Sequence, residues 1–110
     1  MDVKMTEEVV FSERDGVLVA ALRCELDHHT AKRVRELIDR ELFRMKPECL
    51  VLDFSEVSFM DSSGVGLILG RVESAGANGA SVRLSGLSAS LMKLVRLSGI
   101  ERIKNLTISK

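Results

Sequence analysis

The stretch CLVLDFSEVSFMDSSGVGLILGRV, residues 49–72, decides how the rest of the sequence folds. Its first part, residues 49–54, is an apolar run after Pro47 that is too short for a core helix. It predicts a central strand covered on both faces. The last part places four apolar residues at helical spacing, namely Val65, Ile68, Leu69 and Val72. A strand, a tight turn and a helix are therefore expected in this order.

The turn between strand and helix contains small hydroxyls, a carboxylate and glycine. It places Ser62 and Ser63 at the start of the helix, just past the carboxyl end of the strand. Ligands bind at this position in open α/β sheets, and a helix start presents free N–H groups and a partial positive charge to an anion. From the residues alone, a serine here serves as a helix cap, a phosphate ligand or a phosphorylation site.

Before this stretch, the sequence predicts two strands and a helix. Residues 8–11 form a short edge strand, and Asp15-Gly16 forms the turn to a strand over residues 17–24. That strand is apolar on both faces, which predicts an interior position with both sides covered. Asp27 and Thr30 are good caps for a helix that continues to about residue 45.

After this stretch, the sequence predicts two more strands and a helix between them. The helix that starts at about residue 63 runs to about residue 75, and its Gly66 and Gly70 each cost about 1 kcal/mol relative to Ala. Such glycines indicate a close approach, either to the sheet or to a partner. A strand over residues 80–85 precedes a helix capped by Ser88 or Ser90, which ends at Gly99 before a weaker strand over residues 102–108.

The order ββαβαβαβ predicts an α/β fold with a mostly parallel sheet and one antiparallel hairpin at the start. The 110 residues are enough for one domain, residues 1–110. Sixteen basic and sixteen acidic residues cancel, and Trp and Tyr are absent, so nucleic-acid binding is not expected. No signal peptide or membrane span is recognisable, and Cys24 and Cys49 are expected to be buried free thiols, so we expect a cytoplasmic protein.

Three catalytic or ligand-binding alternatives fit the residues less well. A hydrolase nucleophile at Ser62 needs a G-x-S-x-G turn, but Met60 stands at the first glycine position. Adjacent His28 and His29 diverge at a helix start and rarely chelate one metal, so neither a metal nor another cofactor is expected. The turn also lacks the lysine of a nucleotide-binding P-loop.

Two segments resemble signatures of the anti-anti-sigma factors, the small STAS-domain antagonists of bacterial anti-sigma factors. Residues 59–71 (FMDSSGVGLILGR) resemble the main signature, and residues 25–31 (ELDHHTA) resemble the second, in the right order and at the right separation. Residues 92–99 (MKLVRLSG) resemble a third, weaker one. The resemblance extends over nearly the whole sequence and is greatest to the antagonists of the sporulation anti-sigma factor.

The resemblance implies a βα superhelix with a mixed sheet of four or five strands and helices packed on it. It implies a regulator that is not an enzyme. The unphosphorylated form would bind an anti-sigma factor that is also a serine kinase of the histidine-kinase-like ATPase fold, and would thereby release the sigma factor. The kinase would phosphorylate Ser62, and a PP2C-type phosphatase would reverse the modification.

The resemblance also implies one partner surface around both signatures. The residues expected on it are Asp27, His28, His29, Met60, Asp61, Ser62, Ser63, Gly64 and Leu67. Met60 and Leu67 flank the turn and are expected to be exposed apolar anchors of the interface, with packing in the core as an equal alternative for Met60.

Two other functions remain as alternatives. One is a STAS-type subunit of another assembly that is never phosphorylated. The other is a small enzyme that uses Ser62 or a nucleotide at the helix start.

Overall fold

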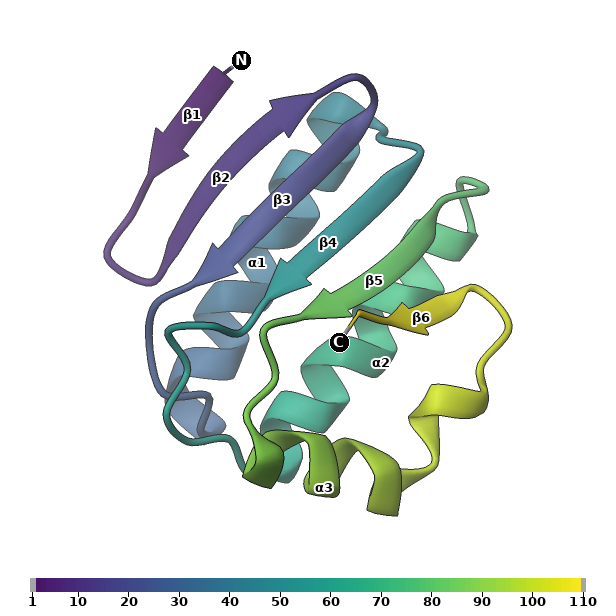
Figure 1. Ribbon diagram of the computed structural model, residues 1–110. Helices are drawn as coiled ribbons and strands as arrows, with labels where there is room; N and C mark the ends of the chain where they lie inside the picture. The colour runs from purple at the N-terminus through teal and green to yellow at the C-terminus, as the bar shows by residue number, and fades with distance from the viewer. Residues whose placement is uncertain (1, 110) are drawn as a thin grey trace.

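The computed structural model describes residues 2–109, which form a six-stranded sheet with helices behind it (Figure 1). The elements in chain order are β1 (Asp2–Met5), β2 (Val9–Arg14), β3 (Val17–Leu22), α1 (His28–Met45), β4 (Cys49–Asp53), α2 (Ser62–Gly76), β5 (Ser81–Ser85), α3 (Ala89–Ser98), the 3₁₀ helix η1 (Ile100–Arg102) and β6 (Leu106–Ile108). None of the helices in this part of the chain combines the length and the hydropathy that a transmembrane span requires.

The strands lie side by side in the order in which they occur in the chain. The pairs β1–β2 and β2–β3 are antiparallel, and the pairs from β3 to β6 are parallel. Parallel crossovers are right-handed in nearly all proteins, so a chain that always steps in one direction places its helices on one face of the sheet. This mixed sheet with helices packed on it confirms the predicted fold class.

The number of strands differs from the prediction of four or five. β1 was missed because its four residues, DVKM, carry no strong apolar pattern. The predicted strand over residues 102–108 is only three residues long, because η1 and a turn take up its first part. The Asp15-Gly16 turn is confirmed: both residues have positive φ, 51° and 80°, as a two-residue hairpin turn requires.

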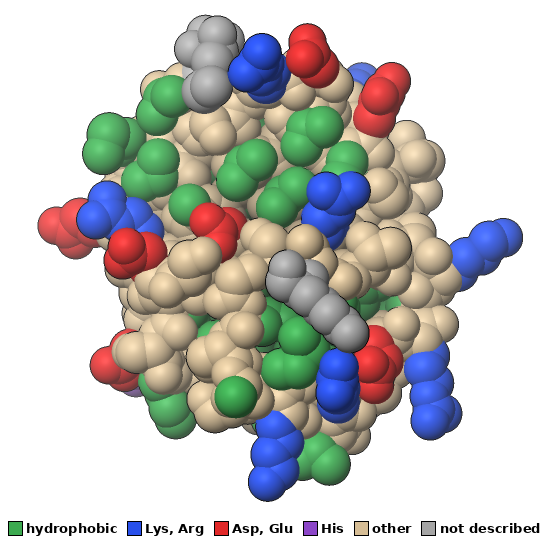
Figure 2. Space-filling view, in the orientation of Figure 1, with side chains coloured by type: hydrophobic (Ala, Val, Ile, Leu, Met, Phe, Trp, Pro, Cys, Tyr) green, Lys and Arg blue, Asp and Glu red, His purple; other side chains and the backbone are tan. Residues whose placement is uncertain are grey.

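The prediction that the interior strands are covered on both faces is wrong. In β3, Leu18, Ala20 and Leu22 are buried, but the residues between them are only partly buried. In β4 the same alternation leaves Val51 on the uncovered face. Figure 2 shows hydrophobic side chains across this front face of the sheet. An apolar run on both faces of a strand does not indicate which face the helices cover.

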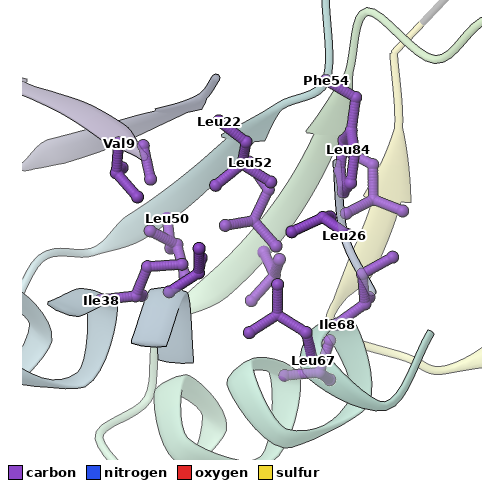
Figure 3. Packing of buried hydrophobic residues seen from close by; sticks show 14 of the residues in the cluster. Val9, Leu22, Leu26, Ile38, Leu50, Leu52, Phe54, Leu67, Ile68 and Leu84 are labelled. Atoms are coloured by element: carbon purple, nitrogen blue, oxygen red, sulfur yellow. The ribbon is translucent and has the colours of Figure 1, made fainter. Parts of the chain in front are cut away.

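A single core lies between the sheet and the helices (Figure 3). Leu22, Leu52 and Leu84 extend from three neighbouring strands, and Ile38 and Ile68 face them from α1 and α2. All five side chains are fully buried. The carboxyl ends of β3 and β4 are therefore held in place by packing in the hydrophobic core.

Candidate functional site

The two segments that lead from a strand into a helix, before α1 and before α2, are hydrogen-bonded to each other. The Leu26 N–H donates to the Phe59 carbonyl at 3.0 Å, and the Asp61 N–H donates to the Leu26 carbonyl at 3.1 Å. Leu26 and Met60 thus form an isolated parallel bridge beyond the ends of β3 and β4. The structure brings together the two sequence signatures that were expected to share a surface.

The start of α1 is closed by a complete capping box. The Asp27 carboxylate accepts hydrogen bonds from the backbone N–H groups of His29 and Thr30, at 2.9 and 3.0 Å. In return, the Thr30 hydroxyl accepts one from the Asp27 N–H at 3.0 Å. The hydrogen bond from the Thr30 N–H is the largest cause that lowers the pKa of Asp27 below its ordinary value. His28 and His29 are exposed, with ring centroids 5.7 Å apart.

The start of α2 is capped by Asp61, whose carboxylate accepts one hydrogen bond, from the Ser63 N–H at 2.8 Å. The alternative that Ser62 or Ser63 caps this helix is therefore wrong. Ser62 is the first residue of α2 and its side chain is exposed. Among residues 2–109, neither serine hydroxyl makes a hydrogen bond. The structure leaves the Ser62 hydroxyl unpaired and accessible, beside a carboxylate.

Met60 and Leu67 are not the exposed anchors that the sequence predicted: only 5% and 4% of their surfaces are exposed. Met60 packs against Gly64, where a Cβ atom would overlap the Met60 Cγ and Sδ atoms. The expected approach of Gly66 and Gly70 to the sheet is also wrong, since no atom lies within 4 Å of a Cβ built on either. The close approach occurs at Gly64 instead.

A hollow of about 440 Å³ lies between the first turns of α1 and α2. It is lined by His28, Ala31, Lys32, Arg35, Ser63, Gly66 and Leu67. Leu67 therefore contributes an edge to this hollow although nearly all of its side chain is buried. Ser63 lines the hollow, but the preceding residue, Ser62, does not.

Among residues 2–109, the other candidate reactive groups do not form a recognisable catalytic or metal site. Cys24 and Cys49 are free and only partly buried. Burial is the main cause that raises the pKa of the Cys24 thiol, and the nearby carboxylates of Glu8 and Asp27 add to it, so this sulfur stays protonated at neutral pH. Among residues 2–109 there is no group of three or more His, Cys, Asp and Glu side chains arranged to hold a metal.

A family model described as the STAS domain matches residues 8–109. The chain belongs to the STAS domain family. It is 34% identical over 99 residues to a protein of Paenibacillus polymyxa named anti-sigma F factor antagonist, an alignment that includes 90% of this chain and 85% of that protein.

Two solved structures of the antagonist SpoIIAA resemble this STAS domain at 30% identity. The unphosphorylated form has a TM-score of 0.73, with 99% of this chain and 87% of the other covered. The phosphorylated form, from Bacillus, has a TM-score of 0.65, with 99% and 90% covered. The family and the fold that the resemblance implied are thereby confirmed.

Two residues of this STAS domain that line the hollow, Lys32 and Arg35, were not predicted as site residues. Both are exposed and lie on α1 outside its buried stripe. Their signal was present in the spacing: His28, Lys32 and Arg35 recur at intervals of four and three residues and so lie on one face of the helix. The sequence did not show that this face borders α2.

Proposed function

We propose that this protein is an anti-sigma factor antagonist controlled by phosphorylation of Ser62. The unphosphorylated form binds an anti-sigma factor that is also a serine kinase of the histidine-kinase-like ATPase fold, and the sigma factor is released. Phosphorylation ends the binding, and a PP2C-type phosphatase restores it. The protein acts in the cytoplasm, by binding and not by catalysis.

The observation that carries this proposal is the state of the Ser62 hydroxyl. It is exposed at the first position of α2 and makes no hydrogen bond among the described residues. Asp61 performs the capping, so the fold does not require the serine side chain. A kinase therefore has access to a hydroxyl whose modification breaks no contact. Relatives named as antagonists, and the two forms in which SpoIIAA was solved, support the same conclusion.

A phosphate on Ser62 has little effect on the fold itself. It carries a charge of about −1.5 to −2 near neutral pH. The start of α2 favours this charge by roughly 0.3–1 kcal/mol at an exposed position. The Asp61 carboxylate, on the preceding residue, opposes it by a comparable amount. The two contributions nearly cancel, so the helix stays formed.

The effect on a covering interface is much larger. Burying an unpaired dianion costs several kcal/mol, and each 1.4 kcal/mol changes the affinity about tenfold. A partner that covers Ser62 loses about three orders of magnitude in affinity by this route. The switch is thus electrostatic and local, and needs no refolding.

Mass spectrometry and binding measurements with the kinase captured from the native bacterium test the proposal. Incubation with the kinase and ATP adds one phosphate, which maps to Ser62. Ser62→Ala is not phosphorylated and stays bound in the presence of ATP, whereas Ser62→Asp, which places a single negative charge in the interface, binds more weakly than the wild type. Ser63→Ala is the matched control and is still phosphorylated.

Tight binding of Ser62→Asp would contradict the electrostatic mechanism. Absence of any phosphate on the wild-type protein would favour the unmodified STAS subunit instead. Hydrolysis of a nucleotide by the purified protein alone would favour the enzyme.

A further inference from the structure

The hollow between α1 and α2 is lined by both cationic and apolar residues. Its titratable residues are His28, Lys32 and Arg35, and no carboxylate lines it. Ala31, Gly66 and Leu67 form the remaining wall with Ser63. Its volume of about 440 Å³ lies within the roughly 300–1,000 Å³ that pockets for ligands or side chains span.

The cations that line the hollow have no partner within the described chain. Ion pairs elsewhere in residues 2–109 engage Arg33 with Glu8 and Arg44 with Glu41, but none involves Lys32 or Arg35. Two neighbours on the same helix therefore differ: Arg33 is paired on one face, and Lys32 is unpaired on the face toward α2.

Asp39, four residues after Arg35 on α1, is already engaged. Asp39 Oδ1 lies 2.9 Å from Nε of Arg71, an ion pair without hydrogen-bond geometry, and Arg71 is 4% exposed. Burial is the main cause that lowers the pKa of Arg71, and the positive charge of Arg35 adds to it. The positive charges of Arg35 and Arg71 thus repel each other, and Asp39 is paired with Arg71. The residues that line the hollow thus include Lys32 and Arg35 but no carboxylate, in a protein whose formal net charge is zero.

We propose that this hollow receives an acidic side chain, Asp or Glu, of the partner protein. The carboxylate pairs with Lys32 and Arg35, and its aliphatic part rests on Leu67. The unpaired Ser63 hydroxyl offers a further donor. This inference rests on the proposed function, because the partner is the anti-sigma factor that covers Ser62.

Gly66 has a direct role in this arrangement. It lines the hollow, and a Cβ at this position meets no atom within 4 Å. A side chain therefore fits without disturbing the fold, but it fills the space that the partner's carboxylate needs. Gly70 is the matched position one turn later, with the same free space and outside the hollow.

Two pairs of variants test the inference with the captured anti-sigma factor. Gly66→Gln and Gly70→Gln both keep or raise the melting temperature, since glycine disfavours a helix. We expect only Gly66→Gln to lose partner affinity, by at least tenfold. Lys32→Gln/Arg35→Gln together lower the affinity by about 10–100-fold and flatten its dependence on salt. Arg40→Gln, an exposed residue of α1 outside the hollow, changes it by less than about threefold.

The inference is overturned if the Lys32/Arg35 double variant and Gly66→Gln bind the partner as the wild type does. It is also overturned if inorganic phosphate, at ionic strength matched with chloride, saturates the hollow at low concentration in an NMR titration, since the hollow would then be a small-anion site. Ser62→Asp separates this failure from failure of the proposed function. If Ser62→Asp still weakens binding of the partner, control by phosphorylation of Ser62 is supported even though no acidic side chain binds in the hollow.

Discussion

The starts of α1 and α2 are built on the same plan but are completed differently. Each follows a parallel strand, each is capped by an aspartate, and the two are tied together through Leu26 and Met60. At the third position of the helix, however, α1 has Thr30 and α2 has Gly64. Thr30 completes a capping box, and Gly64 has no side chain to do so.

Under the proposed function, this difference separates a structural helix start from the helix start that is phosphorylated. Met60 fills the space next to Gly64, so α2 cannot carry a side chain at this position without moving a buried methionine. The α2 start therefore relies on Asp61 alone, and the hydroxyls of Ser62 and Ser63 stay free. A free hydroxyl at a rigid helix start is suited to modification because nothing in the fold depends on it.

The largest effect is expected from breaking the contact between Met60 and Gly64. Met60→Ala removes a buried side chain and lowers the free energy of unfolding by about 2–5 kcal/mol. Gly64→Ala overpacks the same contact. It lowers the free energy of unfolding by about 1–2 kcal/mol, a net value that includes the gain in helix propensity. Gly66→Ala, which meets no atom, stabilises by up to about 1 kcal/mol. Urea denaturation measures all three.

The double variant Met60→Ala/Gly64→Ala sharpens this prediction. Because the alanine at position 64 fills part of the cavity, the double variant loses less stability than the sum of the single variants, by about 1 kcal/mol. Strict additivity would mean that the two residues do not restrict each other.

A smaller effect is expected from removing one hydroxyl at each helix start. Thr30→Ala breaks the capping box and lowers the free energy of unfolding by about 1 kcal/mol. Ser62→Ala breaks no hydrogen bond and changes it by less than about 0.5 kcal/mol. Chemical denaturation of both variants measures the contrast, and equal losses would remove the distinction between the two helix starts.

The smallest effect is a pH dependence at the α1 start. The pKa of Asp27 in the folded protein lies below its ordinary value of 3.8, so the ionised carboxylate stabilises the fold above that pH. This contribution is lost as the pH falls through the folded pKa. Thermal melts between about pH 2 and pH 6 should show the wild type losing more stability on acidification than Asp27→Asn, which keeps a capping oxygen. An equal loss of stability in the wild type and in Asp27→Asn on acidification would contradict this prediction.

The predicted fold agrees with the structure where a local signal is sufficient. The Asp15-Gly16 turn needs positive φ at both residues, which glycine and aspartate tolerate. Gly99 ends α3, as predicted, in the left-handed conformation with φ of 78°, and Ile100 beyond it is buried. These features depend on the conformations that individual residues allow.

The prediction fails where the outcome depends on which surfaces meet. Apolar runs in β3 and β4 did not show that the helices cover only one face of the sheet. Met60 beside a polar turn suggested exposure, but the packing against Gly64 buries it. Lys32 and Arg35 are exposed, as their position opposite the apolar stripe of α1 predicts, but the sequence did not show that they lie against α2.

The sequence by itself determined the alternation of strands and helices, the aspartate cap of α1 and the position of the serine pair at the start of α2, because backbone preferences and capping chemistry act within a few residues. Only the tertiary structure decided that the two helix starts lie together, that Met60 is buried and that Lys32 and Arg35 lie against α2. Those outcomes depend on contacts between segments more than thirty residues apart, such as Leu26 with Met60 and α1 with α2. Local propensity does not specify such contacts.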